Sequence, residues 1–175
     1  MAETIGKILF TEEQIRRRAE ELGAEITKDY EGRELICVGT LNGAVMWMCE
    51  LIKHINLDVR LDFLSAHSYG GGTVSTGVIT VTKDLEFDIQ GKDVLIIEDI
   101  IDSGNTLYYL KHHFFPEKQP RSVKICTMLD KPARREADIT ADYTGFTVDD
   151  LFIVGFGLDY DQRYRALPYI SYLEG

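Results

Sequence analysis

The sequence predicts an α/β fold in which a central, mostly parallel sheet is flanked by helices. Two apolar runs without polar alternation, at 35–38 and 94–97, indicate strands that are covered on both faces, as in a parallel sheet. Each run is followed by a short polar loop that contains glycine, and then by a segment with helical periodicity. Repeated strand, loop and helix units are typical of this class.

In the first half of the chain, Thr11 and Gln14 form a capping-box pattern, and Gly23 after Leu22 is a helix-stop signal. We therefore expect an exposed, charge-rich helix between them. The other elements predicted here are a strand at 35–38, a helix from about 44 to 55 and a strand at 59–66.

In the second half, Pro116 and Pro120 are expected to bracket a loop, and the polar residues 134–141 are expected to form a connection. The predicted elements are two short alternating arms at 77–82 and 85–89, the central strand at 94–97, a helix at 106–115, and strands at 123–129 and 151–156.

Length and charge restrict the class of protein. A chain of 175 residues fits one domain. A net charge of −10 disfavours non-specific nucleic-acid binding, because that affinity comes mainly from Lys and Arg neutralising phosphates. The apolar stretch without charged residues at 35–49 is too short to span a bilayer, so no membrane partner is expected.

Three cysteines, Cys37, Cys49 and Cys126, are odd in number and lie in apolar runs, which is typical of reduced core residues in a cytosolic protein. The N-terminus carries Glu3 and Lys7 and lacks a signal-peptide core. We therefore expect a cytoplasmic protein.

Three acidic residues, Glu98, Asp99 and Asp102, follow the apolar run at 94–97. An unpaired buried charge costs roughly several kcal/mol, so these carboxylates are expected at the carboxyl end of the strand. There they can meet solvent, a cation or a substrate.

Four small, polar or turn-forming residues come next: Ser103, Gly104, Asn105 and Thr106. They lead directly into an apolar periodicity that starts at Leu107, so the order is strand, tight loop and helix. Such a loop directs backbone N–H groups and the positive end of the helix dipole at one point, which makes it an anion site. Acids and a phosphate site are therefore expected side by side.

The stretch 94–107, V-L-I-I-E-D-I-I-D-S-G-N-T-L, resembles the phosphoribosyl-pyrophosphate signature of the type I phosphoribosyltransferases, in the wording of their hypoxanthine-guanine branch. A Walker B strand would need a G-x-x-x-x-G-K-[ST] partner, which the sequence lacks. A receiver-type acidic pocket would not need the S-G-N-T loop. The resemblance implies a type I phosphoribosyltransferase fold, with one domain over 1–175, a small hood built from both ends of the chain and a flexible flap at about 66–90.

The resemblance also implies an activity. It is the magnesium-dependent transfer of a 5-phosphoribosyl group from phosphoribosyl pyrophosphate (PRPP) to N9 of a 6-oxopurine base, hypoxanthine and also guanine, with release of pyrophosphate in purine salvage. A preference for xanthine or adenine stays open, as does a nucleotide-responsive regulator that binds nucleic acid, which the acidic composition disfavours. Related enzymes form dimers and tetramers, so a homodimer or homotetramer is expected.

Within the signature, the resemblance implies a role for each polar residue. Glu98 and Asp99 would hold the ribose hydroxyls and magnesium, and Asp102 would take the proton from N7 of the base. The 5′-phosphate would be bound by Asp102, Ser103, Gly104, Asn105 and Thr106.

The loop Leu41-Asn42-Gly43 is similar to a Leu-Lys-Gly loop of the family, whose backbone contains a cis non-proline peptide bond and contacts pyrophosphate. Asn42 stands where lysine is common, so one cation is missing and the backbone contact is the expected one. The sequence leaves open whether the peptide bond is cis here.

The segment His67-Ser68-Tyr69 is followed by three consecutive glycines, which give the backbone great freedom. Ser68 and Tyr69 resemble the start of the family's mobile loop, which closes over the site and excludes water from a cationic transition state. A plain hairpin linker is the alternative.

Lys131 follows the strand at 123–129 and precedes Pro132. In the family, a lysine at this position donates to the exocyclic oxygen of a 6-oxopurine. An ammonium cannot accept a hydrogen bond, so it favours an oxo group over the amino group of adenine. The alternative is a solvated surface lysine.

The phrase F-I-V-G-F-G-L-D-Y-D-Q-R-Y-R at 152–165 resembles the C-terminal part of the hypoxanthine-guanine enzymes. Phe152 would stack on the purine, unless it is a core aromatic residue, and the backbone of Ile153 would bind the edge of the base. Asp159 would help to hold a second magnesium, and Arg165 would contact pyrophosphate.

Overall fold

The computed structural model describes residues 4–68 and 79–174 of the chain. Its centre is a six-stranded sheet in the order β4-β3-β2-β5-β6-β7, in which all neighbours are parallel except β3 and β4. The strands are β2 (Leu35–Thr40), β3 (Val59–Ser68), β4 (Ile79–Lys83), β5 (Asp93–Ile101), β6 (Ser122–Asp130) and β7 (Tyr143–Thr147). The predicted α/β class with a mostly parallel central sheet is confirmed.

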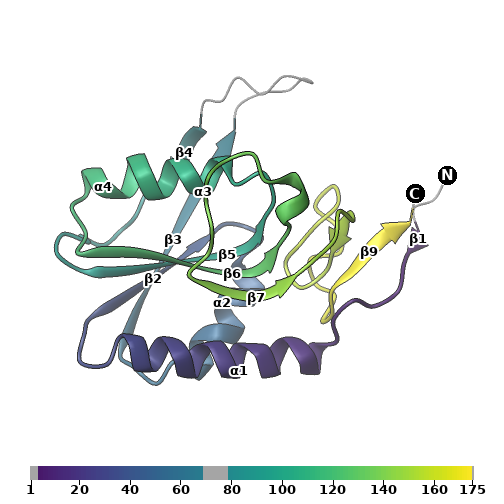
Figure 1. Cartoon of the computed structure of the whole chain (residues 1–175), viewed down its shortest axis with the longest axis horizontal. Helices are drawn as coiled ribbons and strands as arrows, with labels where there is room; N and C mark the ends of the chain where they lie inside the picture. Colours follow the sequence, from purple (N-terminus) through teal and green to yellow (C-terminus); the bar gives the residue numbers. More distant parts are fainter. Residues whose placement is uncertain (1–3, 69–78, 175) are drawn as a thin grey trace.

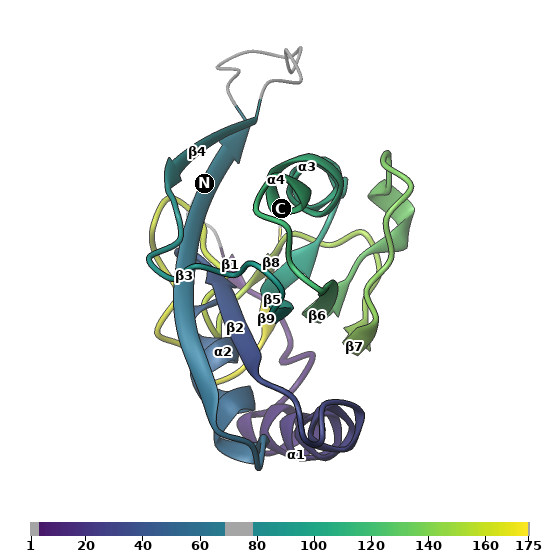
Figure 2. The same cartoon turned by 90° about the vertical axis from the view of Figure 1, so that its left-hand side faces the viewer.

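Helical segments cover both faces of this sheet, as Figure 1 and Figure 2 show. One face carries α1 (Glu12–Asp29), α2 (Val45–Leu51) and the 3-10 turn η1 (Ile52–His54), and the other carries α3 (Asn105–Tyr109), η2 (Leu110–Phe114) and α4 (Phe115–Glu117). Alternate residues of β5 enter the two cores, Leu95 and Ile97 on the α1 side and Val94 and Ile96 on the α3 side. This explains why the strand has no polar alternation. Within the described chain, no helix is long and apolar enough to cross a bilayer.

A second, three-stranded sheet joins segments from both ends of the chain. β1 (Thr4–Ile5) pairs antiparallel with β9 (Ser171–Glu174), and β9 pairs antiparallel with β8 (Ile153–Val154). Figure 1 shows this small sheet beyond one end of the main sheet, next to both termini. The predicted last strand at 151–156 is therefore wrong in two respects, because β8 is shorter and belongs to the small sheet, and β9 follows it.

The first helix does not end at Gly23, as predicted, but continues to Asp29. The capping box of Thr11 and Gln14 is confirmed. A Cβ at Gly23 would lie 2.6 Å from both Cβ and the carbonyl oxygen of His54. Glycine at this position therefore permits close packing of α1 against η1 and is not a helix stop.

β3 and β4 form an antiparallel pair, and the expected strand at 85–89 is absent from the described chain. The buried carboxylate of Asp62 accepts hydrogen bonds from the backbone N–H groups of Glu86 (2.8 Å) and Phe87 (3.0 Å), which fixes this segment as a turn. Tyr69 lies outside the described residues, and Ser68 is the last residue of β3.

Two further elements differ from the prediction. The helix expected at 106–115 extends from 105 to 117, with a π-helical turn in its middle. Pro116 therefore lies inside the end of this helix, directly after the π-helical turn, and does not begin the following loop. β7 was not predicted, because Gly145 weakens its strand pattern. A Cβ at Gly145 would overlap the carbonyl oxygen of Met128, so glycine there permits the close approach of β6.

Candidate active site

The carboxyl ends of β2 and β5 meet at one edge of the main sheet. The two strands are parallel neighbours with Gly39 opposite Ile97, so the loops that follow them leave the sheet together. Thr40 Oγ1 donates a hydrogen bond to Glu98 Oε1 at 2.7 Å and joins the two strand ends.

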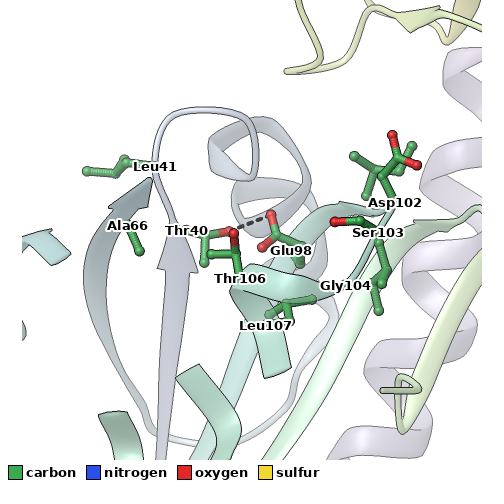
Figure 3. A pocket seen from close by; sticks show the side chains of 11 residues that line it. Thr40, Leu41, Ala66, Glu98, Asp102, Ser103, Gly104, Thr106 and Leu107 are labelled. Atoms are coloured by element: carbon green, nitrogen blue, oxygen red, sulfur yellow. Dashed lines mark hydrogen bonds between the residues drawn. The ribbon is translucent and has the colours of Figure 1, made fainter. Parts of the chain in front are cut away.

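A pocket of about 220 Å³ opens at this edge. Figure 3 shows Glu98 with its hydrogen bond to Thr40 on one side and Asp102 and Ser103 on the other. The lining residues are Thr40, Leu41, Ala66, Glu98, Ile100, Ile101, Asp102, Ser103, Gly104, Thr106 and Leu107. Carboxylates and a glycine-containing loop therefore share one cavity.

The loop from Ser103 to Thr106 turns sharply into the helix that starts at Asn105. Gly104 has a φ of +82°, which glycine adopts without strain, and a Cβ there would lie 2.5 Å from Cγ2 of Ile139. Ser103 Oγ accepts a hydrogen bond from the backbone N–H of Asn105 at 3.4 Å. The first N–H groups of a helix lack partners within that helix, so this loop can bind an anion.

Glu98 and Asp99 are half-buried neighbours at the end of β5. Burial, followed by the neighbouring Asp99 carboxylate, raises the pKa of Glu98 well above its usual value. Burial also raises the pKa of Asp99, although hydrogen bonds and the Arg165 guanidinium act in the opposite direction. The folded site therefore disfavours the ionised form of both carboxyl groups, and a cation or a donor ligand would stabilise that form.

The loop after β2 lies directly on Asp99. A Cβ at Gly43 would overlap the Asp99 carboxylate, so only glycine fits there. The Leu41–Asn42 peptide bond is cis. This loop thus lies beside both the acidic pair and the 220 Å³ pocket, which Leu41 lines.

A C-terminal loop packs against the other side of Gly43. A Cβ at Gly157 would overlap the carbonyl oxygen of Gly43, and Arg165 Nη1 donates to the carbonyl oxygen of Gly157 at 2.6 Å. Arg165 also forms an ion pair with Asp159, with 2.8 Å between Nη2 and Oδ1. The fold therefore brings Asp159 and Arg165 next to the 41–43 loop.

A second pocket of about 190 Å³ adjoins the first and shares Ile100 and Asp102 with it. Its other lining residues are Lys131, Arg134, Asp150, Leu151, Phe152, Ile153 and Leu158. The side chain of Phe152 is 53% exposed, which rules out the core-aromatic interpretation, and its ring meets the Tyr160 ring edge-on at 5.4 Å between centroids. An open aromatic face next to polar groups suits a flat heterocycle.

Lys131 is not a solvated surface lysine, because it is only 5% exposed. Its Nζ donates to the carbonyl oxygen of Leu151 at 3.0 Å and lies 3.6 Å from Oδ2 of Asp102 and 3.7 Å from Oδ1 of Asp150. Two carboxylates therefore balance the ammonium at the back of the second pocket.

Asp102 links the two pockets. Its Oδ2 faces Lys131, whereas its Oδ1 is buried and has no hydrogen-bond partner in the described chain. A buried polar atom without a partner is costly, so this oxygen is suited to accept a hydrogen bond or a proton from a ligand.

Comparisons with known proteins agree with this geometry. A family model described as a phosphoribosyl transferase domain matches residues 7–161. The chain is 49% identical to the hypoxanthine-guanine phosphoribosyltransferase of Bacillus subtilis over 99% of this chain and 96% of that protein. It is 51% identical to the protein of the same name from Streptococcus thermophilus, over 97% of this chain and 94% of that protein.

The chain belongs to the hypoxanthine-guanine phosphoribosyltransferase family. A crystal structure of a hypoxanthine phosphoribosyltransferase from Staphylococcus aureus matches with a TM-score of 0.93 and 48% identity, over 97% of this chain and 92% of that one. The type I phosphoribosyltransferase fold, predicted from the signature, is confirmed.

In this phosphoribosyltransferase, the predicted site residues from four separate stretches of sequence gather around the two pockets. Those not yet placed are Asn42 in the 41–43 loop, which is exposed, and Ile153, which is buried at the start of β8. Thr40, Ile100, Arg134 and Asp150 also line the pockets, although they were not predicted. Thr40 could have been found as the last residue of β2 before the loop, whereas the polar context of Asp150 carries no such signal.

The candidate metal ligands Glu98, Asp99 and Asp159 do not together form a complete metal-binding site. In the part of the chain that the structure describes, no three His, Cys, Asp or Glu side chains are grouped to hold an ion. Asp159 is bound by Arg165 and accepts a hydrogen bond from the backbone N–H of Gln162 at 2.8 Å. Magnesium usually takes one or two carboxylates and completes its shell with water and substrate phosphates, and Glu98 and Asp99 fit that pattern.

Proposed function

We propose that this chain transfers a 5-phosphoribosyl group from PRPP to N9 of hypoxanthine and guanine, giving the mononucleotide and pyrophosphate in purine salvage. The observation that carries the proposal is the position of Asp102, which lines two adjoining pockets and has one buried carboxylate oxygen without a hydrogen-bond partner among residues 4–68 and 79–174. A base in the second pocket and a sugar phosphate in the first would therefore meet at this residue.

The chemistry of a 6-oxopurine suits the second pocket. Hypoxanthine and guanine carry N7 and O6 on one edge, and Asp102 Oδ2 lies 3.6 Å from Lys131 Nζ. In our proposal, Lys131 donates to O6, Asp102 takes the proton from N7 as the base attacks, Phe152 stacks on the ring and the backbone of Ile153 binds its edge. General-base assistance is worth typically 10² to 10⁴-fold.

The first pocket would hold the ribosyl phosphate. We assign the 5′-phosphate to the backbone and hydroxyl groups of Ser103, Gly104, Asn105 and Thr106, and the ribose hydroxyls to Glu98 and Asp99. The loss of pyrophosphate from ribose C1 develops positive charge on the sugar, which these two carboxylates stabilise.

Pyrophosphate would be bound where the 41–43 loop meets Arg165. The backbone N–H groups of Asn42 and Gly43 offer donors beside Leu41, whose own N–H donates to the carbonyl oxygen of Leu64 at 2.8 Å. The guanidinium of Arg165 provides the positive charge that Asn42 does not. When magnesium is bound, Glu98, Asp99 and Asp159 would hold it, and it would neutralise the departing pyrophosphate.

We further propose that residues 1–175 form one domain, in which the small sheet is a hood over the base and residues of about 66–90, with Ser68 and Tyr69 among them, form a flap. A cytoplasmic location fits the three unpaired cysteines. We propose a homodimer or homotetramer, without nucleic acid or membrane as a partner, which light scattering tests.

The deciding experiment compares turnover of hypoxanthine, guanine, xanthine and adenine with PRPP and magnesium. We expect hypoxanthine and guanine to react and adenine to be rejected, because the Lys131 ammonium cannot accept a hydrogen bond from a 6-amino group. Preferential turnover of adenine or xanthine would contradict the assignment of the second pocket, and absence of turnover with all four bases would contradict the proposed reaction.

A further inference from the structure

A short segment, residues 135–139, lies behind the 103–106 loop, and we call it the backing segment. It binds three successive backbone carbonyl groups at the end of β5. Arg135 Nη2 donates to the carbonyl oxygen of Ile101 at 3.1 Å, and Arg135 Nε donates to that of Asp102 at 3.0 Å. The backbone N–H groups of Glu136 and Ala137 donate to the carbonyl oxygen of Ser103 at 2.9 and 3.1 Å.

These bonds determine where the loop directs its donors. In a trans peptide group, C=O and N–H point in opposite directions. The carbonyl groups of Asp102 and Ser103 point at the backing segment, so the N–H groups of Ser103 and Gly104 point away from it. Among the described residues, none accepts a hydrogen bond from these two N–H groups. They are therefore left for a ligand in the first pocket, which Ser103 and Gly104 line.

The side chain of Arg135 is suited to this task by its shape as well as its charge. It is 15% exposed, its charge is balanced by an ion pair with Asp130, and its Nη1 donates to the carbonyl oxygen of Ile139 at 2.6 Å. The guanidinium thus joins the ends of β5 and β6 to the backing segment through a planar set of donors. A lysine at this position would keep the charge, but its single ammonium nitrogen cannot donate to all of these oxygens at once, as the planar guanidinium does.

We infer that Arg135 is a positioning residue for the phosphate of the substrate. By binding the carbonyl group of Asp102, it directs the N–H group of Ser103 toward the phosphate, and by binding that of Ile101 as well, it holds the backbone that carries the Asp102 carboxylate. The inference rests on the proposed function, because it assigns a phosphate to the first pocket.

The test is Arg135→Lys, with Arg18→Lys as the matched control. Arg18 also donates to two backbone carbonyl groups, those of Gly145 at 3.0 Å and Thr144 at 2.8 Å, but it joins α1 to β7. Binding of inosine 5′-monophosphate and of inosine is measured by calorimetry. We expect Arg135→Lys to weaken mononucleotide binding by about tenfold or more, as is common when a binding group is misplaced, and nucleoside binding by less than about twofold.

If Arg135 had only a structural role, Arg135→Lys would weaken the binding of both ligands equally or of neither. Equal weakening of the two ligands, or the same phosphate-specific loss in Arg18→Lys, overturns the inference. Turnover of the unaltered protein is measured first: its absence contradicts the proposed function, whereas normal turnover with unchanged binding by Arg135→Lys contradicts only the role of Arg135.

If Arg135→Lys does not fold, Glu136→Ala provides the test. Glu136 is exposed, and its Oε2 accepts a hydrogen bond at 2.8 Å from Nδ2 of Asn105, at the start of the helix. Removing this contact should weaken binding of the mononucleotide by about two- to fivefold, which is roughly the net contribution of one weak hydrogen bond. Binding of inosine should stay unchanged. Unchanged mononucleotide binding in Glu136→Ala overturns the inference.

Discussion

At the scale of single residues, Asp102 has the most consequential environment. Its Oδ1 is buried and has no hydrogen-bond partner in the part of the chain that the structure describes, and its Oδ2 lies 3.6 Å from Nζ of Lys131. Asp102→Asn preserves the shape of the side chain but removes its basicity. We expect turnover to fall by about 10² to 10⁴-fold, while binding of PRPP changes little. Steady-state kinetics with isothermal titration of PRPP checks both quantities.

Asp150→Asn is the comparison for this variant. The Asp150 carboxylate is about as close to Lys131, at 3.7 Å, but it lines only the second pocket and is held by Arg134 at 2.7 Å. We expect less than about a tenfold loss of turnover, because Asp150 does not face both substrates. Equal losses in the two variants would mean that Asp102 acts through the charge of Lys131 and not as the base.

Glu98 provides a prediction about stability and pH. Burial raises its pKa well above the ordinary value, so between about pH 4.3, typical of an unfolded glutamate, and the raised folded value, the folded protein binds more protons than the unfolded chain. The free energy of unfolding therefore falls as pH rises through this window. Glutamine does not titrate and can accept the hydrogen bonds from Thr40 and Asp99.

Glu98→Gln should therefore raise the melting temperature of the ligand-free protein at pH 7.5, and the gain should vanish below about pH 4. Each kcal/mol gained corresponds to about 2–4 °C in a chain of this size. Calorimetry at several pH values measures the difference, with Glu25→Gln on the exposed face of α1 as the control, expected to change the melting temperature by less than about 1 °C. A gain that persists at pH 3.5 would mean that packing, and not ionisation, is responsible.

At the scale of elements, the sequence predicted those whose signal lies in one continuous segment. β5 is apolar on both faces over 94–97, so the strand itself could be predicted. Its predicted end at residue 97 is wrong, because pairing with β6 continues through Glu98 to Ile101. β7 could not, because its glycine weakens the local pattern and is explained only by the close approach of β6. The segment 85–89 alternates like a strand, but the buried Asp62 carboxylate binds its backbone N–H groups.

The contact between α1 and η1 provides a prediction at the same scale. In an exposed helix interior, alanine is more stable than glycine by about 1 kcal/mol. At Gly23 we expect the opposite, because a Cβ would lie 2.6 Å from His54 backbone and Cβ atoms. Gly23→Ala should lower the free energy of unfolding by about 1–3 kcal/mol, as overpacking does. The control is Ala24→Gly at the next position, which is exposed, and it should lower the free energy of unfolding by about 1 kcal/mol. Both variants are therefore expected to be less stable than the unaltered protein, although they exchange the same two residue types in opposite directions. Urea denaturation measures each free energy.

At the scale of the whole molecule, the candidate site combines parts that the sequence keeps far apart. The signature at 94–107 could be recognised because acids, loop and helix start are contiguous. The contact of Gly43 with Asp99 and Gly157, and the support of the 103–106 loop by residues 135–139, could not be predicted, because they depend on which loops the parallel sheet brings to one edge. Sequence alone therefore predicted the chemistry better than the scaffold that orients it.

The rates at which the three cysteine thiols are modified report on the stability of the folded chain. Cys37 and Cys126 are fully buried in the core under α1 and α2, whereas Cys49 is exposed on α2. Burial raises the pKa of Cys37 to about 12 and that of Cys126 even further, so neither is a reactive thiolate at pH 8. We expect Ellman's reagent to modify one thiol per folded chain rapidly and the other two only when the core opens.

Because opening of the core is governed by global stability, Gly23→Ala should accelerate modification of the two slow thiols by about 5- to 150-fold, corresponding to its 1–3 kcal/mol, and should leave the fast thiol unchanged. Mass spectrometry of the labelled peptides distinguishes the three sites. Slow labelling that does not respond to Gly23→Ala would mean that Cys37 and Cys126 become accessible through local motion of the sheet. Protection of Cys49 in the folded protein would instead place a second copy of the chain over α2, which links this experiment to the expected homo-oligomer.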